Sequence, residues 1–196
     1  MIKKINKLFV YLSLMMGIVV ISSNFLVQFP IKYFGLEEIL TYGALSYPVT
    51  FLITDLSNRA FGKFLARRIV YLGFTIGIFL TLIASTNFNE LISIRIAIGS
   101  GVAFLIAQNL DINIFDKLRK NKKWYIAPLF SSLLGSFIDT FLFFVISFYK
   151  TGVPWVTLAI GDFLIKILIA LLMLIPFRLF LKRIKDLSGG NFLYKT

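Results

Sequence analysis

Asp55, Asn58 and Arg59 place an acid, an amide and a base within five residues of an otherwise apolar stretch. Asp55 and Arg59 are spaced i and i+4, so their side chains share one face of a helix. A charged group in a bilayer helix costs about 2.5–3.5 kcal/mol or more, so it needs a partner or a function. Two interpretations are open: a polar wall facing a central solute cavity, or a self-neutralising ion pair with Arg59 reaching the headgroups.

A second pair with the same spacing, Asp162 and Lys166, lies in the last apolar run of the chain. At 1.5 Å per residue, Lys166 lies roughly 17 Å along that helix, close to the middle of a bilayer. Such a pair is either functional or structural, and buried ion pairs contribute little to stability. The sequence leaves both interpretations open.

The composition identifies the elements that must position these side chains. Of the 196 residues, 58% are hydrophobic. They form runs of about twenty residues, the length needed to cross roughly 30 Å of hydrocarbon. We therefore expect an all-α integral membrane protein, with residues 1–196 forming a single transmembrane domain. The six expected helices span about 8–29, 42–61, 69–86, 91–110, 125–148 and 155–181.

The positive charges indicate how these helices are oriented. Most of the 21 Lys and Arg residues lie near the two termini and in the connectors after the second and fourth helices, whereas the opposite loops carry Lys32 and Lys150. Because cytoplasmic loops are enriched in Lys and Arg, we expect both termini to be cytoplasmic. The net charge of +12 is then a topology signal, strengthened by anionic lipid, and no nucleic-acid partner is expected.

Six helices divide into two halves of three, and such halves are related by inversion in many transporters. Asp55 and Asp139 support this division, because each lies roughly 21–23 Å along a helix and the two helices run in opposite directions. The two acids then lie at comparable depths from opposite faces. We expect a 3+3 inverted repeat, with Asp55 and Asp139 on opposite walls of one site.

The residue types exclude several kinds of chemistry. The chain has no cysteine and no histidine, so thiol nucleophiles, disulfides and the commonest metal ligands are absent, and we expect no metal site. It carries no H-E-x-x-H, G-x-S-x-G or Walker motif, so we expect no enzyme activity and no cofactor. Any proton coupling must use carboxylates such as Asp55, Asp139 or Asp162.

Other polar residues have two readings each. Asp111 follows the fourth expected helix, and it either caps a short amphipathic segment or belongs to the polar constellation. Ser131, Ser132, Gly135 and Ser136 have the spacing of small residues at a close helix contact. Their hydroxyls could instead line a cavity.

These residues resemble the signature of the queuosine precursor transporter family, also called the putative vitamin uptake transporter family. The resemblance covers about residues 42–174, and the first expected helix carries only a weak match. It rests on Tyr47-Pro48, Phe51, Thr54-Asp55-Leu56, Asn58-Arg59, Gly62, Arg67, Arg95, Gln108, Asp111, Trp124, Ser131-Ser132, Gly135-Ser136 and Asp139-Thr140, with a looser match at Gly161-Asp162 and Lys166.

The resemblance implies a multi-pass transporter of the cell inner (plasma) membrane that imports a 7-deazaguanine, such as 7-cyano-7-deazaguanine, for queuosine modification of tRNA. Carboxylates can accept hydrogen bonds from the N–H groups of this planar base, amide or guanidinium groups can donate to its carbonyl, and aromatic rings can cover its faces. The candidate substrate-binding residues are Asp55, Asn58, Arg59, Gln108, Ser132, Asp139, Thr140, Asp162 and Lys166.

The alternative is a substrate-capture subunit of a multi-component ATP-driven importer. Those subunits dock on their partner through small residues, often alanines, of the first helix. Here residues 8–29 contain no alanine. A homodimer is compatible with either interpretation.

Overall fold

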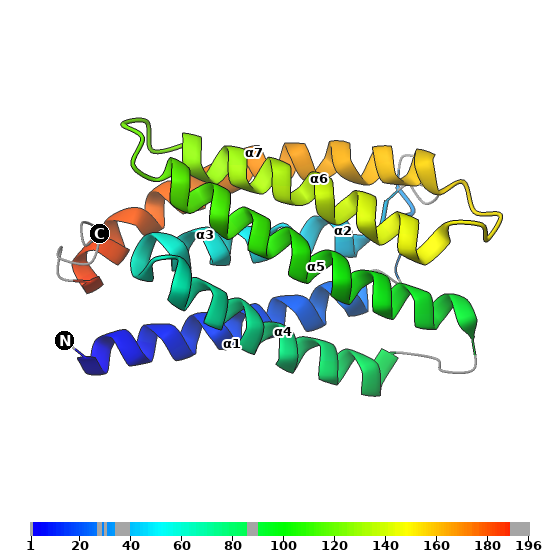
Figure 1. The fold of residues 1–196 in the computed structure, drawn as a ribbon, viewed down its shortest axis with the longest axis horizontal. Helices are drawn as coiled ribbons and strands as arrows, with labels where there is room; N and C mark the ends of the chain where they lie inside the picture. The colour runs from blue at the N-terminus through cyan, green and yellow to red at the C-terminus, as the bar shows by residue number, and fades with distance from the viewer. Residues whose placement is uncertain (1, 27–28, 30, 34–39, 86–89, 189–196) are drawn as a thin grey trace.

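The computed structural model describes residues 2–26, 29, 31–33, 40–85 and 90–188, which form an elongated bundle of helices (Figure 1). The expected all-α architecture is confirmed for this part of the chain. In chain order, the described helices are α1 (Ile2–Leu26), α2 (Tyr42–Ser46), α3 (Val49–Phe61), α4 (Lys63–Ser85), α5 (Leu91–Leu118), α6 (Ile126–Phe148) and α7 (Trp155–Ser188).

Five described helices are long and apolar enough to cross a membrane. Their outer faces are apolar: on α7, for example, Leu164, Leu168 and Ile175 are each more than half exposed. A surface of this kind is stable when lipid covers it. The protein is therefore a multi-pass membrane protein. The five spans are Lys7–Leu26, Lys63–Ile83, Leu91–Leu118, Ile126–Phe148 and Trp155–Leu181.

The expected helix 42–61 is not continuous. It is divided into α2 and α3, and neither is long enough to cross a membrane alone. Pro48 explains the division, because it has no N–H to donate and its ring crowds the preceding turn. Tyr47 and Pro48 nevertheless keep right-handed helical dihedrals, so α3 continues in nearly the direction of α2 (Figure 1).

Other helices are longer than expected. α4 begins at Lys63, one residue after Gly62, whose φ of 78° is readily adopted by glycine. α5 continues past residue 110 to Leu118, because Ile112 and Phe115 extend its buried face by more than one further turn. Residues 27–28 and 86, at the ends of two expected helices, lie outside the described residues.

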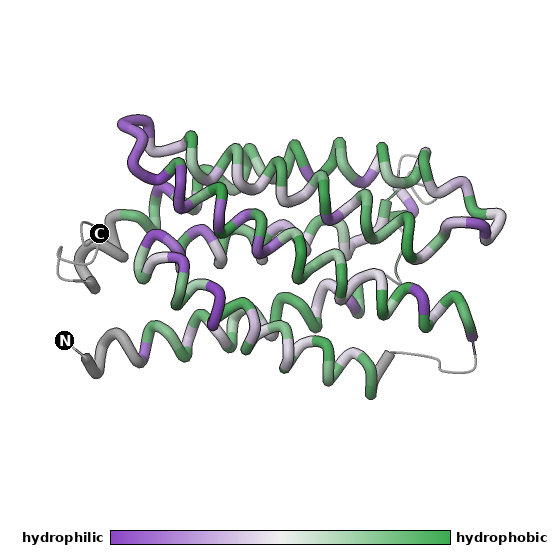
Figure 2. Tube along the Cα trace, in the orientation of Figure 1, coloured by the Kyte–Doolittle hydropathy of each residue, from purple (hydrophilic) through white to green (hydrophobic). Residues whose placement is uncertain are grey.

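The ends of the helices form two groups (Figure 1). α1 begins and α7 ends at the end of the bundle that also carries the α3–α4 turn and the α5–α6 connector. Figure 2 shows that this end is rich in hydrophilic residues. α5 and α6 make the most extensive helix contact, followed by α1 and α4.

The contact of α1 with α4 depends on glycines of α4. A Cβ added at Gly73 would lie 2.4 Å from Cγ of Met16, whereas one added at Gly101 of α5 would meet nothing closer than 3.5 Å. We expect Gly73→Ala to lower the free energy of unfolding by about 1–3 kcal/mol, the usual cost of overpacking. Thermal unfolding in detergent measures this effect, and Gly101→Ala is the matched control. Equal stability of the two variants would contradict the close contact.

Candidate functional site

α3 is the most enclosed helix of the bundle, and it is also polar. It contacts α1, α4, α5, α6 and α7. Thr50, Thr54, Asp55, Ser57 and Asn58 are all buried, each at most 2% exposed. Since buried polar groups require hydrogen-bond partners, the neighbouring helices must supply them. Two groups of polar side chains result: one surrounds the middle of α3, and the other lies beside its start.

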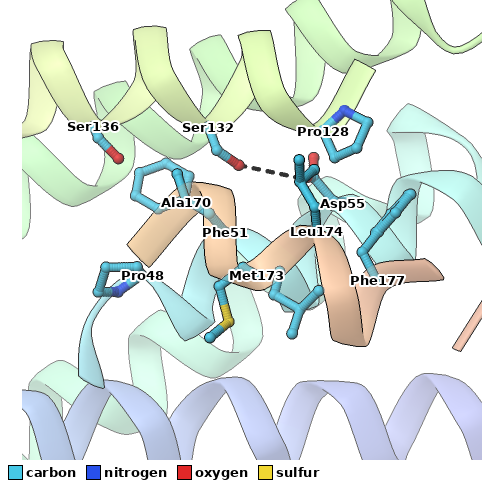
Figure 3. Close-up of a pocket in the computed structure, with 11 residues that line it drawn as sticks. Pro48, Phe51, Asp55, Pro128, Ser132, Ser136, Ala170, Met173, Leu174 and Phe177 are labelled. Carbon is cyan, nitrogen blue, oxygen red and sulfur yellow. Dashed lines mark hydrogen bonds between the residues drawn. The ribbon is translucent and has the colours of Figure 1, made fainter. Parts of the chain in front are cut away.

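The first group surrounds Asp55. Its two carboxylate oxygens accept hydrogen bonds from the hydroxyls of Ser131 and Ser132 on α6, at 3.1 and 3.2 Å. Asp55 and Ser132 also line a pocket between α3, α6 and α7 (Figure 3). Phe51 and Phe177 supply aromatic walls to this pocket, which has space for little more than a water molecule. The arrangement offers one acceptor-rich carboxylate beside apolar and aromatic surface.

Amide side chains join α3 to α5 beside this group. Gln108 accepts a hydrogen bond from Thr54 and donates one to Thr50, at 3.0 Å. Asn58 donates to the carbonyl of Ile112 at 2.8 Å. Both predicted amide ligands therefore hold helices together in this conformation. Offering their amide groups to a solute would require α3 and α5 to separate.

The second group lies at the start of α3 and is built around Lys166 of α7. Its ammonium group is 3.0 Å from Asp139 of α6 and 2.7 Å from Asp162. It also donates to Thr140 at 3.0 Å, and Thr140 donates to Asp162 at 2.7 Å. The hydroxyl of Tyr47 donates to the second oxygen of Asp139 at 2.8 Å, and Lys166 lies over the Tyr47 ring. One cation and two carboxylates thus form a closed network among three elements.

Arg59 lies at the end of α3 that is nearer to the α5–α6 connector. Its guanidinium donates to the carbonyl of Arg119 at 2.8 Å. Arg119 in turn donates to the carbonyl of Asn58 and pairs with Asp116 at 3.2 Å. The guanidinium groups of Arg59 and Arg119 thus bind carbonyl groups near the C-terminal ends of α5 and α3, where a positive charge is favourable. Arg59 is absent from the residues that line the pocket.

The nine candidate residues do not form one site: eight of them lie in two separate groups, and Arg59 lies apart from both. Asp55 and Ser132 share the pocket, with Asn58 and Gln108 behind them, and Arg59 lies further along α3. Asp139, Thr140, Asp162 and Lys166 form the second group. The pair of Asp162 and Lys166, expected from their spacing, is present.

Three contributors were not among the candidates. Tyr47 binds Asp139, and Ser131 binds Asp55. The capping interpretation of Asp111 is wrong, because α5 continues past it and its side chain is fully buried. Its position three residues after Gln108, on the same helix face, was the available signal.

A helical multi-pass bundle with charged side chains enclosed between its helices has the construction of a membrane transport protein. The family described as "Putative vitamin uptake transporter" matches residues 41–181, and the chain belongs to this family. No solved structure matches the chain.

Three relatives carry related names. "Queuosine precursor transporter" of Escherichia coli (strain K12) is 34% identical, and the alignment covers 92% of this chain and 91% of that protein. "Probable queuosine precursor transporter" of Haemophilus influenzae is 32% identical, over 85% of this chain and 83% of that protein. The protein of the same name in Bacillus subtilis (strain 168) is 28% identical, over 81% and 78%.

Proposed function

We propose that this protein imports a queuosine precursor, a 7-deazaguanine such as 7-cyano-7-deazaguanine, across the cell inner membrane. The names of three relatives that align over most of the chain support this cargo. The observation that carries the proposal is the buried carboxylate of Asp55 in a pocket with aromatic walls. A carboxylate can accept two hydrogen bonds from the adjacent N–H groups of a guanine-like edge. The comparisons do not favour the capture subunit of an ATP-driven importer.

The proposed topology has six crossings, with α2 and α3 together forming the second. Discontinuous helices of this kind commonly occur at the solute sites of transporters. An even number of crossings agrees with the start of α1 and the end of α7 lying at one end of the bundle (Figure 1). The basic connectors lie at the same end, and we assign this end to the cytoplasm.

Two reciprocal contacts support a 3+3 inverted repeat. The same number of positions separates Asp55 from Asp139 as separates Tyr47 from Ser131. Tyr47 donates to Asp139, and Ser131 donates to Asp55. A twofold axis between α3 and α6 would exchange these two contacts. The repeat therefore assigns equivalent roles to the two acids, one in each half.

Transport requires the pocket to change size. A deazaguanine is far larger than a water molecule, so this conformation is closed around the site. α7 supplies one wall through Met173 and Phe177, and Pro176 within the helix removes one backbone hydrogen bond there. We propose that movement of α7 against α3 and α6 admits the base, alternately from each side of the membrane.

Cells that can neither make nor import the precursor test this function. We expect expression of the full chain to restore uptake of labelled 7-cyano-7-deazaguanine and queuosine in tRNA. Unlabelled base should compete with the labelled base, since transport through a site is saturable. Cells with an empty vector provide the baseline. Uptake at that baseline, with the protein verified in the membrane, would reject the proposed cargo.

A further inference from the structure

Asp111 of α5 is a buried acid that lies outside the two groups of hydrogen-bonded side chains. Its side chain is fully buried, and neither of its carboxylate oxygens has a hydrogen-bond donor among the described residues. An unpaired buried charge is among the costliest features that a protein can hold, and more so within a membrane. The carboxyl group of Asp111 therefore requires a hydrogen-bond donor or a positive charge other than the described side-chain and backbone groups.

The carboxyl group of Asp55, another acid, lies beside Asp111. The two carboxyl groups face each other at hydrogen-bonding range, and the hydroxyl of Ser131 faces both. The hydroxyl of Ser131 donates its single proton to one oxygen of Asp55, and the hydroxyl of Ser132 donates its own proton to the other. Asp55 therefore has two donors, whereas Asp111 has none. Two ionised carboxylates cannot occupy such a site without a positive charge between them.

The described Lys and Arg side chains of the helices around Asp55 and Asp111 are exposed or contact other groups. α6 presents hydroxyls and no charged group to the pair, and Lys7 of α1 is exposed. Lys117 of α5 is exposed as well. The other described cations of these helices have the following contacts: Lys166 with Asp139 and Asp162, Arg67 with Asn113, Arg68 with the ring of Phe64, Arg95 with the carbonyls of Ile146 and Tyr149, Lys63 and Arg119 with Asp116, Arg59 with the carbonyl of Arg119, and Arg178 with the ring of Trp124.

We propose that Asp55 and Asp111 share one proton and form the cation-binding site that couples transport to the proton gradient. The proton lies between the two carboxyl groups, so that one donates to the other and the pair carries a single negative charge. A shared proton gives one of the two orphaned oxygens of Asp111 a partner without added volume. The packing in this region is tight: a Cβ at Gly135 would lie 3.4 Å from Cβ of Asp111 and 2.6 Å from Phe51.

The position of the pair connects it to the solute pocket. Asp55 lines the pocket and Asp111 lies behind it. When N–H groups of the cargo bind Asp55, the shared proton can reside on Asp111, and the pair keeps its single charge. This coupling rests on the proposed function, whereas the proton itself does not.

Infrared difference spectroscopy of the purified full-length protein in lipid tests the proton without any cargo. A protonated carboxyl has a carbonyl-stretching band at higher frequency than the carboxylate bands. We expect this band at neutral pH in the unaltered protein, with a shift in deuterated water. Asp111→Asn and Asp55→Asn should each abolish it, since the introduced amide donates permanently to the remaining carboxylate. Asp116→Asn is the matched control, because Asp116 already pairs with Arg119, and should retain the band.

Reconstituted vesicles test the coupling. One proton per base converts a pH difference of one unit into an accumulation of up to about tenfold. We expect Asp111→Asn to reduce the accumulation ratio to one while it still exchanges labelled for unlabelled base. Asp116→Asn should accumulate the base like the unaltered protein.

Several results would overturn the proposal. One is the absence of the band at neutral pH in the unaltered protein, and another is its persistence in Asp111→Asn. Accumulation of the base that requires Na⁺ and does not depend on the pH difference would assign the site to Na⁺ instead. Absence of any base transport, with the band present and sensitive to Asp111, would reject the cargo and leave the shared proton in place.

Discussion

Replacing Lys166 by Met is expected to lower the free energy of unfolding by about 3–5 kcal/mol, because it leaves two buried carboxylates without their cation. Asp139 and Asp162 both lie within 3.0 Å of the ammonium group, whose residue is 5% exposed. Met fills a similar volume, so the loss is electrostatic and not a cavity. Unfolding of the detergent-solubilised protein by heat or denaturant measures the change.

Lys63→Met is the matched control for this prediction. Lys63 makes a 4.0 Å ion pair with Asp116, but its side chain is 59% exposed. Exposed pairs contribute about 0–1 kcal/mol, so the same substitution should cost little here. Adding Asp139→Asn and Asp162→Asn to Lys166→Met should recover most of the lost stability, because the network becomes neutral. Equal costs of Lys63→Met and Lys166→Met would contradict a buried network.

The sequence predicted local relationships well. Charge spacing along one helix predicted the pair of Asp162 and Lys166, because neighbours at i and i+4 follow from helix geometry alone. Hydropathy predicted an all-α membrane protein, because apolar runs of span length have few other uses. Pro48 was visible in the sequence, but its effect on the helix 42–61 depends on how the flanking turns are packed.

Relationships between helices were harder to predict. Asp139 was placed opposite Asp55 by depth, yet its partners are Tyr47 and Lys166, which are distant in sequence. The role of Asp111 stayed open because the hydropathy falls after residue 110, although the buried face of α5 continues through Ile112. Hydropathy indicates which part of a helix can face lipid, whereas the buried face of the helix can continue beyond that part, against other helices.

Asp55→Ala is expected to abolish saturable uptake of the base while the fold remains intact. The stability cost is about 1–3 kcal/mol, because the change leaves the buried groups of Ser132 and Asp111 without their partner but removes no compensating cation. Ser131 retains an acceptor, the carbonyl of Pro128 at 3.4 Å. The loss of binding is larger, since each hydrogen bond to a charged group contributes about 1.5–3 kcal/mol, and two such bonds exceed a hundredfold in affinity.

The dissociation constant of the purified protein for 7-cyano-7-deazaguanine, measured by calorimetry, checks this prediction directly. Ser136→Ala is the control within the same pocket: its hydroxyl lines the wall, but the oxygen has no hydrogen-bond partner among the described residues, so its removal should change affinity little. Asp139→Ala tests the second group of polar residues, around Lys166. Since Lys166 binds Asp139, this variant also disturbs the network, and its stability must be measured alongside its uptake. Normal uptake by both Asp55→Ala and Asp139→Ala would reject the site, because no buried acid of either half would then be needed to hold the base.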